Sequence, residues 1–321
     1  MSQAVESKRF RFTVDPAGPP AGLERAVVAI GNFDGAHLGH RAVIERTRRL
    51  AAELGAPSAV LTFEPHPADF FAGRPVVFRL TPSSVKARAL EEFGLDGAIV
   101  LTFDAALAAL SAEEFVAKVL VERLNVAAVV IGWDFHFGKN RAGSPAFLRE
   151  AGAKWGFHVD IIDKVEAAAR AISSTEIRGA LEAGDVEAAA RLLGRHYAVV
   201  GTVIPGRKLG RALGVPTANV ALEPSNRLAH GIYAVRVLVD GARFGGVASF
   251  GTRPTIDDGP PLLETHLFDF DGDLYGRSIE VAFVRRIRGE QKFDSLEALV
   301  EAMNRDKQEA RAILAGREAS G

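Results

Sequence analysis

The chain has 321 residues, a formal net charge of −1 and no cysteine, and this length favours two domains over a single hydrophobic core. Without cysteine, disulfides, thiolate zinc sites and cysteine nucleophiles are excluded, and the balanced charge argues against nucleic acid as a partner. The N-terminal residues lack an apolar signal core and the apolar runs are too short to span a membrane, so we expect a cytoplasmic protein without membrane contact.

The first half of the chain alternates short β-rich runs with helical patterns. The runs that predict strands are 26–30, 58–63, 97–101, 126–131 and 157–162. A helix is predicted over 38–54, ending at Gly55, with one apolar face made of Val43, Ile44, Leu50, Ala51 and Leu54. Further helix starts are indicated by Pro82, by Ser111 with Glu114, and by Ser144 with Pro145. This alternation predicts an α/β fold with a parallel, doubly wound sheet.

The glycine-rich segment 31–40 lies between the first predicted strand and the first predicted helix. Such a turn presents backbone N–H groups and the positive end of the helix dipole to a phosphate. His37 and His40 are spaced i, i+3, so both rings can lie over the same phosphate-sized space, and phosphate binding should favour their protonation. The alternative is a tight turn with two solvent-exposed histidines.

Three other segments of the first half combine polar groups with features that suit a ligand. Segment 172–178 places hydroxyls before a helix and Arg178 one turn later, as a second contact to phosphates or as a simple cap by Ser174 with a surface arginine. Segments 62–67 and 132–138 follow strands and mix aromatic with polar residues, which suits a flat heteroaromatic ligand. The aromatic side chains of the last segment can equally anchor the loop in the core: Trp133, Phe135 and Phe137.

Beyond about residue 194 the pattern changes to β-runs and turns, with the join between the halves placed between Arg178 and Tyr197. Strands are predicted at 198–204, 232–239, 242–250, 263–268 and 278–287, and hairpin turns at Asp240-Gly241 and Asp271-Gly272. These runs predict an antiparallel sheet or small barrel. A helix over about 294–315 should close one face of it through an apolar stripe of Leu296, Leu299, Val300 and Met303.

Segment 201–214 of the second half interleaves glycines with Arg207, Lys208 and Arg211, which predicts either an anion-binding flap or a basic hairpin turn. Strand spacing puts Thr217 and Asn219 on one face, where two neutral oxygens can meet a hard cation. Glu264 shares a face with His266 and Phe268, and this carboxylate is either a surface charge or a base.

Together these motifs resemble the bacterial bifunctional riboflavin kinase/FMN adenylyltransferase family, also called FAD synthetase, from about residue 26 to 311. In the first half the matching motifs are GNFDGAHLGH, TFEPHP, GWDFHFG and ISSTEIR. In the second half they are GRKLGRALGVPTAN, GIY, GTRPT, ETHLFDFDGDLYG and RGEQKF. The chain departs from the family at His136, where arginine is common, so no required role is assigned to this residue.

The resemblance implies a Rossmann-like nucleotidyltransferase domain over 1–185 and an antiparallel β-barrel riboflavin kinase domain with a C-terminal helix over 186–321. It implies conversion of riboflavin to FMN and of FMN to FAD, with ATP as co-substrate and Mg²⁺ as cofactor. FMN attacks ATP with a phosphate oxygen that is already ionised, so that step needs no base. The riboflavin hydroxyl is not ionised at neutral pH, so the kinase step benefits from one.

The resemblance also assigns roles to individual residues. The catalytic residues are Glu264 as base, with His37, His40 and Arg178 positioning and stabilising charge. The ATP-binding residues are Gly31, Phe33, His37, His40, Ser174, Thr175, Arg178, Gly206, Lys208 and Gly210. The flavin-binding residues are Asn32, His66, Pro67, Asp134, Arg253 and Arg277. Thr217 and Asn219 are the metal ligands.

Two rival interpretations remain, a monofunctional adenylyltransferase with a flavin-binding regulatory barrel and a non-catalytic flavin sensor. The first is disfavoured because Glu264, Thr217 and Asn219 are all present. The sequence leaves self-association open.

Overall fold

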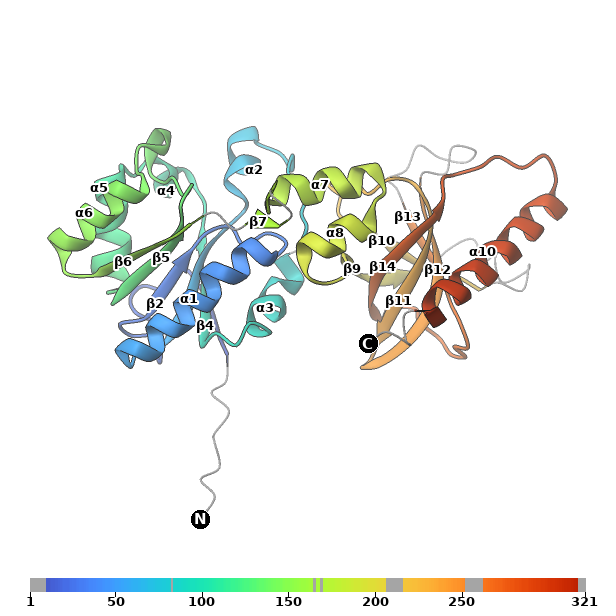
Figure 1. Ribbon diagram of the computed structural model, residues 1–321, viewed down its shortest axis with the longest axis horizontal. Helices are drawn as coiled ribbons and strands as arrows, with labels where there is room; N and C mark the ends of the chain where they lie inside the picture. Colours follow the sequence, from blue (N-terminus) through green and yellow to red (C-terminus); the bar gives the residue numbers. More distant parts are fainter. Residues whose placement is uncertain are drawn as a thin grey trace, which may run out of the picture. The chain divides into compact units, whose positions relative to one another are not determined.

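The computed structural model describes residues 10–81, 83–163, 166–167, 170–205, 216–251 and 262–316. Its chain forms two compact units (Figure 1), of which the first contains residues 1–77 and 83–172 and the second contains 78–82 and 173–321. The domain boundary predicted between 185 and 186 stays a prediction. The compact units assign the helices around residue 180 to the second unit.

The first unit is built on a six-stranded parallel sheet with the order β1-β4-β3-β2-β5-β6. Its strands are β1 (Arg11–Val14), β2 (Val27–Ile30), β3 (Ser58–Glu64), β4 (Gly97–Thr102), β5 (Ala128–Gly132) and β6 (His158–Ile162). The central strands β2 and β3 are buried along nearly their whole length, as expected for a parallel sheet covered on both faces. All five predicted strands are confirmed. The edge strand β1 was missed, since Phe12 and Val14 are exposed and form no apolar pattern.

Helices cover both faces of this sheet, which confirms the doubly wound prediction. They are α1 (Leu38–Leu54), α2 (Pro67–Ala72), α3 (Ser83–Glu91), α4 (Ala105–Ala109), α5 (Ala112–Glu114) with the π-helix η1 (Phe115–Arg123), the short η2 (Lys139–Arg141) and α6 (Pro145–Trp155). One buried cluster joins the sheet to α1 and α3, and another joins it to α5, η1 and α6. A small hairpin of β7 (Glu166–Ala167) and β8 (Arg170–Ala171) completes the unit.

The helix ends predicted at Gly55, Ser111 and Ser144 are confirmed. Gly55 ends α1 in the left-handed conformation at φ 61°, and Ser111 with Glu114 forms a capping box at α5. Ser144 caps α6 with Pro145 in the first turn. Pro82, predicted for the first turn of α3, lies outside the described residues.

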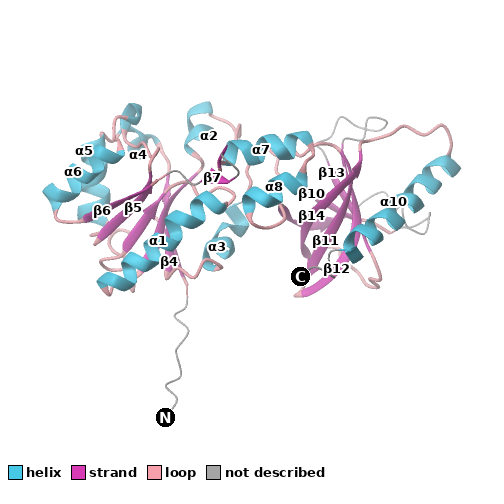
Figure 2. Ribbon diagram, in the orientation of Figure 1, coloured by secondary structure: helices cyan, strands magenta, loops and turns pink. Residues whose placement is uncertain are grey.

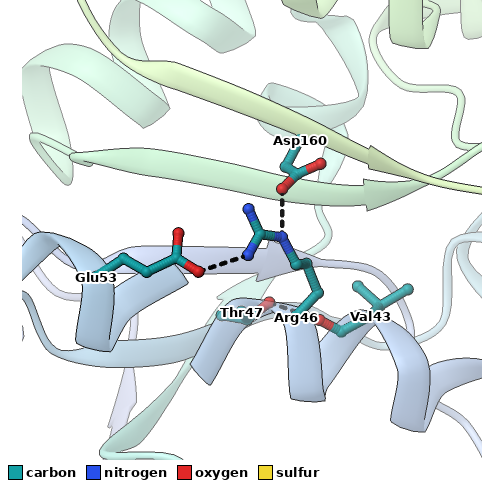
Figure 3. Close-up of polar contacts among 5 residues, drawn as sticks. All are labelled: Val43, Arg46, Thr47, Glu53 and Asp160. Carbon is teal, nitrogen blue, oxygen red and sulfur yellow. Dashed lines mark hydrogen bonds and ion pairs between the residues drawn. The ribbon is translucent and has the colours of Figure 1, made fainter. Parts of the chain in front are cut away.

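An arginine on α1 ties this helix to strand β6, as Figure 3 shows. Arg46 donates from Nε to Asp160 at 2.5 Å and from Nη1 to Glu53 at 2.9 Å, and these hydrogen bonds raise the pKa of the guanidinium. The predicted apolar face of α1 needs one correction. Leu54 is exposed, and Thr47 is buried in its place because its hydroxyl donates to the Val43 carbonyl at 2.8 Å.

The second unit contains a closed antiparallel barrel (Figure 2) with the strand order β10-β13-β12-β11-β14-β9. Its strands are β9 (Ala198–Ile204), β10 (Ala218–Ala221), β11 (Gly231–Val239), β12 (Ala242–Gly251), β13 (Leu262–Leu267) and β14 (Ser278–Arg288). Helices α7 (Ser174–Ala183) and α8 (Val186–Leu193) pack against the barrel core, which includes Tyr197, Tyr233 and Phe283. Among the described residues, no helix is both long enough and apolar enough to cross a membrane.

One of the two predicted hairpins is confirmed and the other is wrong. Asp240-Gly241 turns directly from β11 into β12, which pair from Val239↔Ala242 onward. Asp271-Gly272 does not close a hairpin, because β13 and β14 are not neighbours in the barrel. Strand β13 pairs with β10 and β12, whereas β14 pairs with β9 and β11.

The C-terminal helix α10 (Leu296–Gly316) lies against the barrel, as predicted. In the predicted stripe Leu296 is 56 % exposed, whereas Leu299, Val300 and Met303 are partly buried. The most buried positions lie further along the helix, at Ala302, Asp306, Ala310 and Leu314. Asp306 can be buried because Arg288 of β14 donates to both its carboxylate oxygens, at 2.9 and 2.7 Å.

Candidate active sites

The topology of the first unit brings two of the predicted ligand segments to one edge of the sheet. From β2 the chain first proceeds through β3 to β4 and later returns to β5 on the opposite side of β2. In parallel sheets, ligands bind at the carboxyl ends of strands flanking such a reversal of direction. Loop 31–40 leaves β2 at this point and loop 132–138 leaves β5.

Loop 31–40 has an unusual backbone. Phe33, Gly35 and Ala36 have φ values of 49°, 85° and 42°, in the left-handed region. A bulky residue rarely adopts this conformation, and such local strain is concentrated at ligand-binding sites. The side chain of Phe33 is buried, and its ring meets that of His40 edge to face with centroids 5.2 Å apart. This contact holds the loop against the start of the helix.

The two histidines of this loop lie together, as their spacing predicts. Their rings are stacked, with centroids 3.7 Å apart. His37 is the N-cap of α1, and its Nδ1 accepts the backbone N–H of His40 at 3.2 Å. The alternative of two solvent-exposed histidines is wrong, because His37 is only 6 % exposed and His40 is partly buried. Since Nδ1 of His37 is an acceptor, the neutral ring carries its proton on Nε2, and protonation of Nδ1 would break the cap.

A side chain at Gly39 would crowd the histidine ring and the backbone beside it. A Cβ atom there would lie 3.0 Å from Cε1 and 3.1 Å from Nδ1 of His37, and 3.1 Å from the carbonyl oxygen of Ile172. The glycine therefore allows the capping ring to fold back over the first turn of the helix.

The end of β3 contributes a second group of polar side chains to the same edge. The hydroxyl of Thr62 donates to the Asn32 carbonyl at 3.1 Å, and the side-chain amide of Asn32 lies 3.2 Å from Nε2 of His66. His66 caps α2, since its Nδ1 accepts the N–H of Ala68 at 3.1 Å, and Pro67 occupies the first turn. Neutral His66 then donates from Nε2, so the amide of Asn32 satisfies it by turning its oxygen to the ring. The structure thus brings together Asn32 and His66, two predicted flavin-binding residues.

The aromatic residues of loop 132–138 do not act as one group. Phe135 and Phe137 are stacked at 5.5 Å and pack into the core, which confirms the loop-anchoring alternative for these two. Trp133 is 50 % exposed, and the adjacent Asp134 is exposed as well. The exposed His136 places Nδ1 2.9 Å from the carbonyl of Asp134.

Segment 172–178 begins helix α7 one residue earlier than predicted. Ser173 is the N-cap, since its hydroxyl accepts the N–H of Glu176 at 3.3 Å, so the cap predicted at Ser174 is wrong. Arg178 donates from Nε to the Phe78 carbonyl at 2.8 Å within the second unit. The geometry of the first unit alone therefore contains the histidine pair but not Ser174, Thr175 or Arg178.

In the barrel, the predicted metal ligand and the predicted base lie on neighbouring strands. Asn219 of β10 is directly opposite Glu264 of β13 in the ladder, and Glu264 is opposite Ser249 of β12 on its other side. Burial along β13 alternates, so Glu264 and His266 share the face that points away from the barrel core, as predicted. Asn219 is only 5 % exposed.

His266, to which no role was assigned, holds the backbone next to Thr217 in place beside Asn219 and Glu264. His266 Nδ1 lies 2.8 Å from the carbonyl oxygen of Pro216, the residue before Thr217. Because a carbonyl only accepts, Nδ1 carries the proton. Burial lowers the pKa of His266 and keeps the ring neutral. The spacing of Glu264 and His266 on one strand face was the available sequence signal.

The donor set at Thr217 and Asn219 fits a magnesium ion that is also bound by substrate phosphates. Among the described residues, no group of three or more His, Cys, Asp or Glu side chains could hold a metal by itself. Mg²⁺ commonly takes one or two protein oxygens and completes its shell with phosphates and water. Thr217 is partly buried and Asn219 is buried beside the Glu264 carboxylate, so two oxygen-bearing side chains are available.

The remaining predicted residues divide into two groups. Gly206, Lys208, Gly210 and Arg253 lie outside the described residues. Arg277 precedes β14 and pairs with Asp240 at 3.0 Å, and its carbonyl accepts the N–H of Val203 at 2.9 Å. Val203 is opposite Val220, the residue after Asn219, so Arg277 is fixed close to the strand that carries the predicted metal ligand.

The chain is similar to known proteins along nearly its whole length. The FAD synthetase family matches residues 20–176 and the riboflavin kinase family matches residues 193–314. A bifunctional riboflavin kinase/FMN adenylyltransferase of Pseudomonas fluorescens is 47 % identical over 290 residues, covering 90 % of this chain and 93 % of the relative. The protein of the same name from Haemophilus influenzae is 43 % identical, covering 91 % of this chain and 95 % of the relative.

A solved structure is similar to this chain in three dimensions over nearly the same extent. A crystal structure from Streptococcus pneumoniae, described as a macrolide-efflux protein, superimposes with a TM-score of 0.83 at 30 % sequence identity. The match covers 94 % of this chain and 98 % of that protein. The fold of both units is thus present in a solved structure of the same extent.

Proposed function

The chain belongs to the bifunctional riboflavin kinase/FMN adenylyltransferase family, and from this membership we propose that it makes FAD from riboflavin in two ATP-dependent steps. The kinase step, riboflavin to FMN, is assigned to the barrel of the second unit. The transfer step, FMN to FAD with release of pyrophosphate, is assigned to the sheet edge of the first unit. The observation that carries the proposal is the match of the two enzyme families, in order, to the two halves of one chain.

In the transfer step, an FMN phosphate oxygen forms a bond to the α-phosphorus of ATP while the bond to the bridging oxygen of the leaving pyrophosphate breaks. FMN arrives ionised, so the protein has to orient and to stabilise charge. The capping arrangement supports a role for His37 as a donor through Nε2–H, beside His40 and the first N–H groups of α1. The family resemblance also assigns Gly31, Phe33, Ser174, Thr175 and Arg178 to the ATP site of this step.

The flavin of the acceptor would contact the adjacent part of the same sheet edge. The hydrogen-bonded pair of Asn32 and His66, followed by Pro67, supports this assignment because it offers polar groups next to the histidine loop. Asp134 lies on the loop after β5, which neighbours β2 on the side opposite β3, and would contact the flavin from there.

In the kinase step, Glu264 would accept the proton of the riboflavin 5′-hydroxyl as its oxygen bonds to the γ-phosphorus of ATP and ADP leaves. Thr217 and Asn219 would hold Mg²⁺, which neutralises phosphate charge. The pairing of Asn219 with Glu264 supports this assignment, because metal and base have to act on the same substrates. Gly206, Lys208 and Gly210 would cover the phosphates, and Arg253 and Arg277 would bind the flavin.

The experiment that tests the proposal follows both products in one reaction. The purified chain is incubated with riboflavin, ATP and Mg²⁺, and FMN and FAD are separated by chromatography. Glu264→Ala should abolish FMN formation but leave FAD formation from added FMN, and substitution of both His37 and His40 with alanine should do the reverse. Loss of both activities from either folded variant would refute two separate sites.

The same measurement separates the rival functions. A monofunctional adenylyltransferase would make FAD from FMN but no FMN from riboflavin. A flavin sensor would bind flavin without making either product. The cytoplasmic location remains a prediction, and self-association remains open.

A further inference from the structure

The first unit buries a lysine at the edge of the sheet where the flavin subsite is proposed. Lys86 lies on α3 and is 3 % exposed. Its Nζ lies 2.8 Å from the hydroxyl of Thr62 and 3.1 Å from Oε1 of Glu64. Both partners belong to the end of β3, which runs directly into the segment of His66.

Stability alone does not account for this lysine. An ammonium group loses its hydration on burial, and its attraction to a carboxylate offsets that loss only in part. Replacement of a buried ion pair by apolar residues of similar volume is often neutral or stabilising. The charge at position 86 is thus more readily explained by what it orients than by folding free energy.

The hydrogen bonds around Lys86 have only one possible direction. An ammonium group can only donate, so the Thr62 hydroxyl accepts from Lys86 and must turn its own hydrogen elsewhere. That hydrogen is directed to the Asn32 carbonyl, 3.1 Å away. Lys86 thereby fixes the donor direction of Thr62 and, through it, the backbone position of Asn32.

The same network reaches the flavin subsite by a second path. Glu64, the other partner of Lys86, lies two residues before His66, and the His66 ring contacts the Asn32 side chain at 3.2 Å. Asn32 and His66 come from the ends of different strands, and Lys86 is bonded to both segments through Thr62 and Glu64.

We propose that Lys86 is a positioning residue of the adenylyltransferase site that holds Asn32 and His66 in the geometry that binds FMN. This inference rests on the proposed flavin subsite. Lys86 acts through Thr62 and Glu64 and does not itself contact the substrate. Its loss should therefore affect FMN more than ATP, which is assigned to the histidine loop.

The test compares Michaelis constants of the full chain with Lys86→Met. We expect KM for FMN in FAD formation to rise about tenfold, the effect of losing one charged hydrogen bond. KM for ATP in that reaction should stay within about twofold, and FMN formation from riboflavin should be unchanged. The matched control is Lys118→Met, since Lys118 is exposed on the same unit and pairs with Glu114 at 2.9 Å. It should change none of these values.

A second variant covers the case in which Lys86→Met does not fold. Thr62→Val leaves Glu64 available to the ammonium group and removes the hydroxyl that joins Lys86 to Asn32. It should give the same selective rise in KM for FMN. An equal change in KM for FMN and ATP, or no change in a folded variant, would overturn the proposal.

Two further variants separate this inference from the proposed subsite itself. If Asn32→Ala and His66→Ala leave KM for FMN unchanged, the flavin subsite is wrong, and the proposal for Lys86 fails with it. If they raise it while Lys86→Met does not, only the inference about Lys86 fails. If both are right, Lys86→Met combined with Asn32→Ala should raise KM for FMN by less than the product of the single effects.

Discussion

Asn219 and Glu264 are directly opposite each other on the antiparallel strands β10 and β13, although 45 positions separate them in the sequence. This pairing places an amide that suits Mg²⁺ beside a carboxylate that suits proton abstraction. Both side chains lie on the face directed away from the barrel core, with Glu264 partly exposed and Asn219 buried. The relationship makes the barrel site testable one group at a time.

Removal of the amide should change the magnesium requirement of the kinase step. Asn219→Ala deletes one proposed oxygen ligand, so about tenfold more Mg²⁺ should be needed for half-maximal FMN formation. FAD formation from added FMN should keep its magnesium dependence. FMN formation measured over a magnesium titration checks this, and an unchanged midpoint with a reduced maximum would speak against a ligand role.

We expect His266 to support the kinase step through its hydrogen bond to Pro216 and not through acid–base chemistry of its imidazole ring. His266→Asn can keep a donor at the place of Nδ1, whereas His266→Ala cannot. We expect the asparagine variant to retain most FMN formation and the alanine variant to lose about tenfold, roughly one buried hydrogen bond. Equal activity of the two variants would show that the bond to Pro216 is unimportant.

His266 should also make the stability of the second unit depend on pH. Burial lowers the pKa of His266 below the ordinary value of 6.5, and the nearby cations Lys307 and Arg311 lower it further. The Pro216 carbonyl and Asp269 raise this pKa but do not outweigh the lowering. As the pH falls through 6.5, the unfolded chain binds this proton more readily than the folded chain, so stability decreases until the folded pKa is passed. Thermal unfolding between pH 7.5 and about pH 5 should show a smaller loss in His266→Asn than in the parent chain.

The capping role of His37 can be separated from its proposed catalytic role. Asparagine is among the best N-cap residues, so His37→Asn should fold with nearly parental stability. His37→Ala should lose about 1 kcal/mol of stability to unfolding. Both should lose FAD formation, since neither offers an Nε2–H to phosphate. Retained activity in the asparagine variant would show that His37 acts only as a cap.

A methyl group added at Gly39 should lower FAD formation by displacing the His37 ring. In Gly39→Ala the new Cβ would meet the His37 ring at 3.0 Å and the Ile172 carbonyl at 3.1 Å, so the cap must shift. FAD formation should fall about tenfold, less than the roughly hundredfold cost of a misplacement of about 1 Å, while FMN formation is unaffected. Gly18→Ala is the control, because nothing lies within 4 Å of its Cβ position. Equal activity of the two variants would contradict the packing argument.

The sequence by itself determined the class of fold, most elements and the loops that carry the chemistry. Strands and helices follow local periods, and capping groups such as Ser111 with Glu114 act within one turn of helix. The left-handed end at Gly55 and the proximity of His37 to His40 depend on residues only a few positions apart. Such local features can be predicted because their interacting groups are close together along the chain, whether it is folded or unfolded.

Only the tertiary structure decided which distant segments meet. The order of strands in the barrel separates β13 from β14 and pairs Asn219 with Glu264, and no local pattern specifies a register across strands. The carboxylate of Asp306 on α10 is buried because Arg288, which belongs to another element, donates hydrogen bonds to it. Lys86 would be assigned to the surface from its helix alone. A charged group is buried only where its partners arrive from elsewhere in the fold, and for Lys86 these are Thr62 and Glu64.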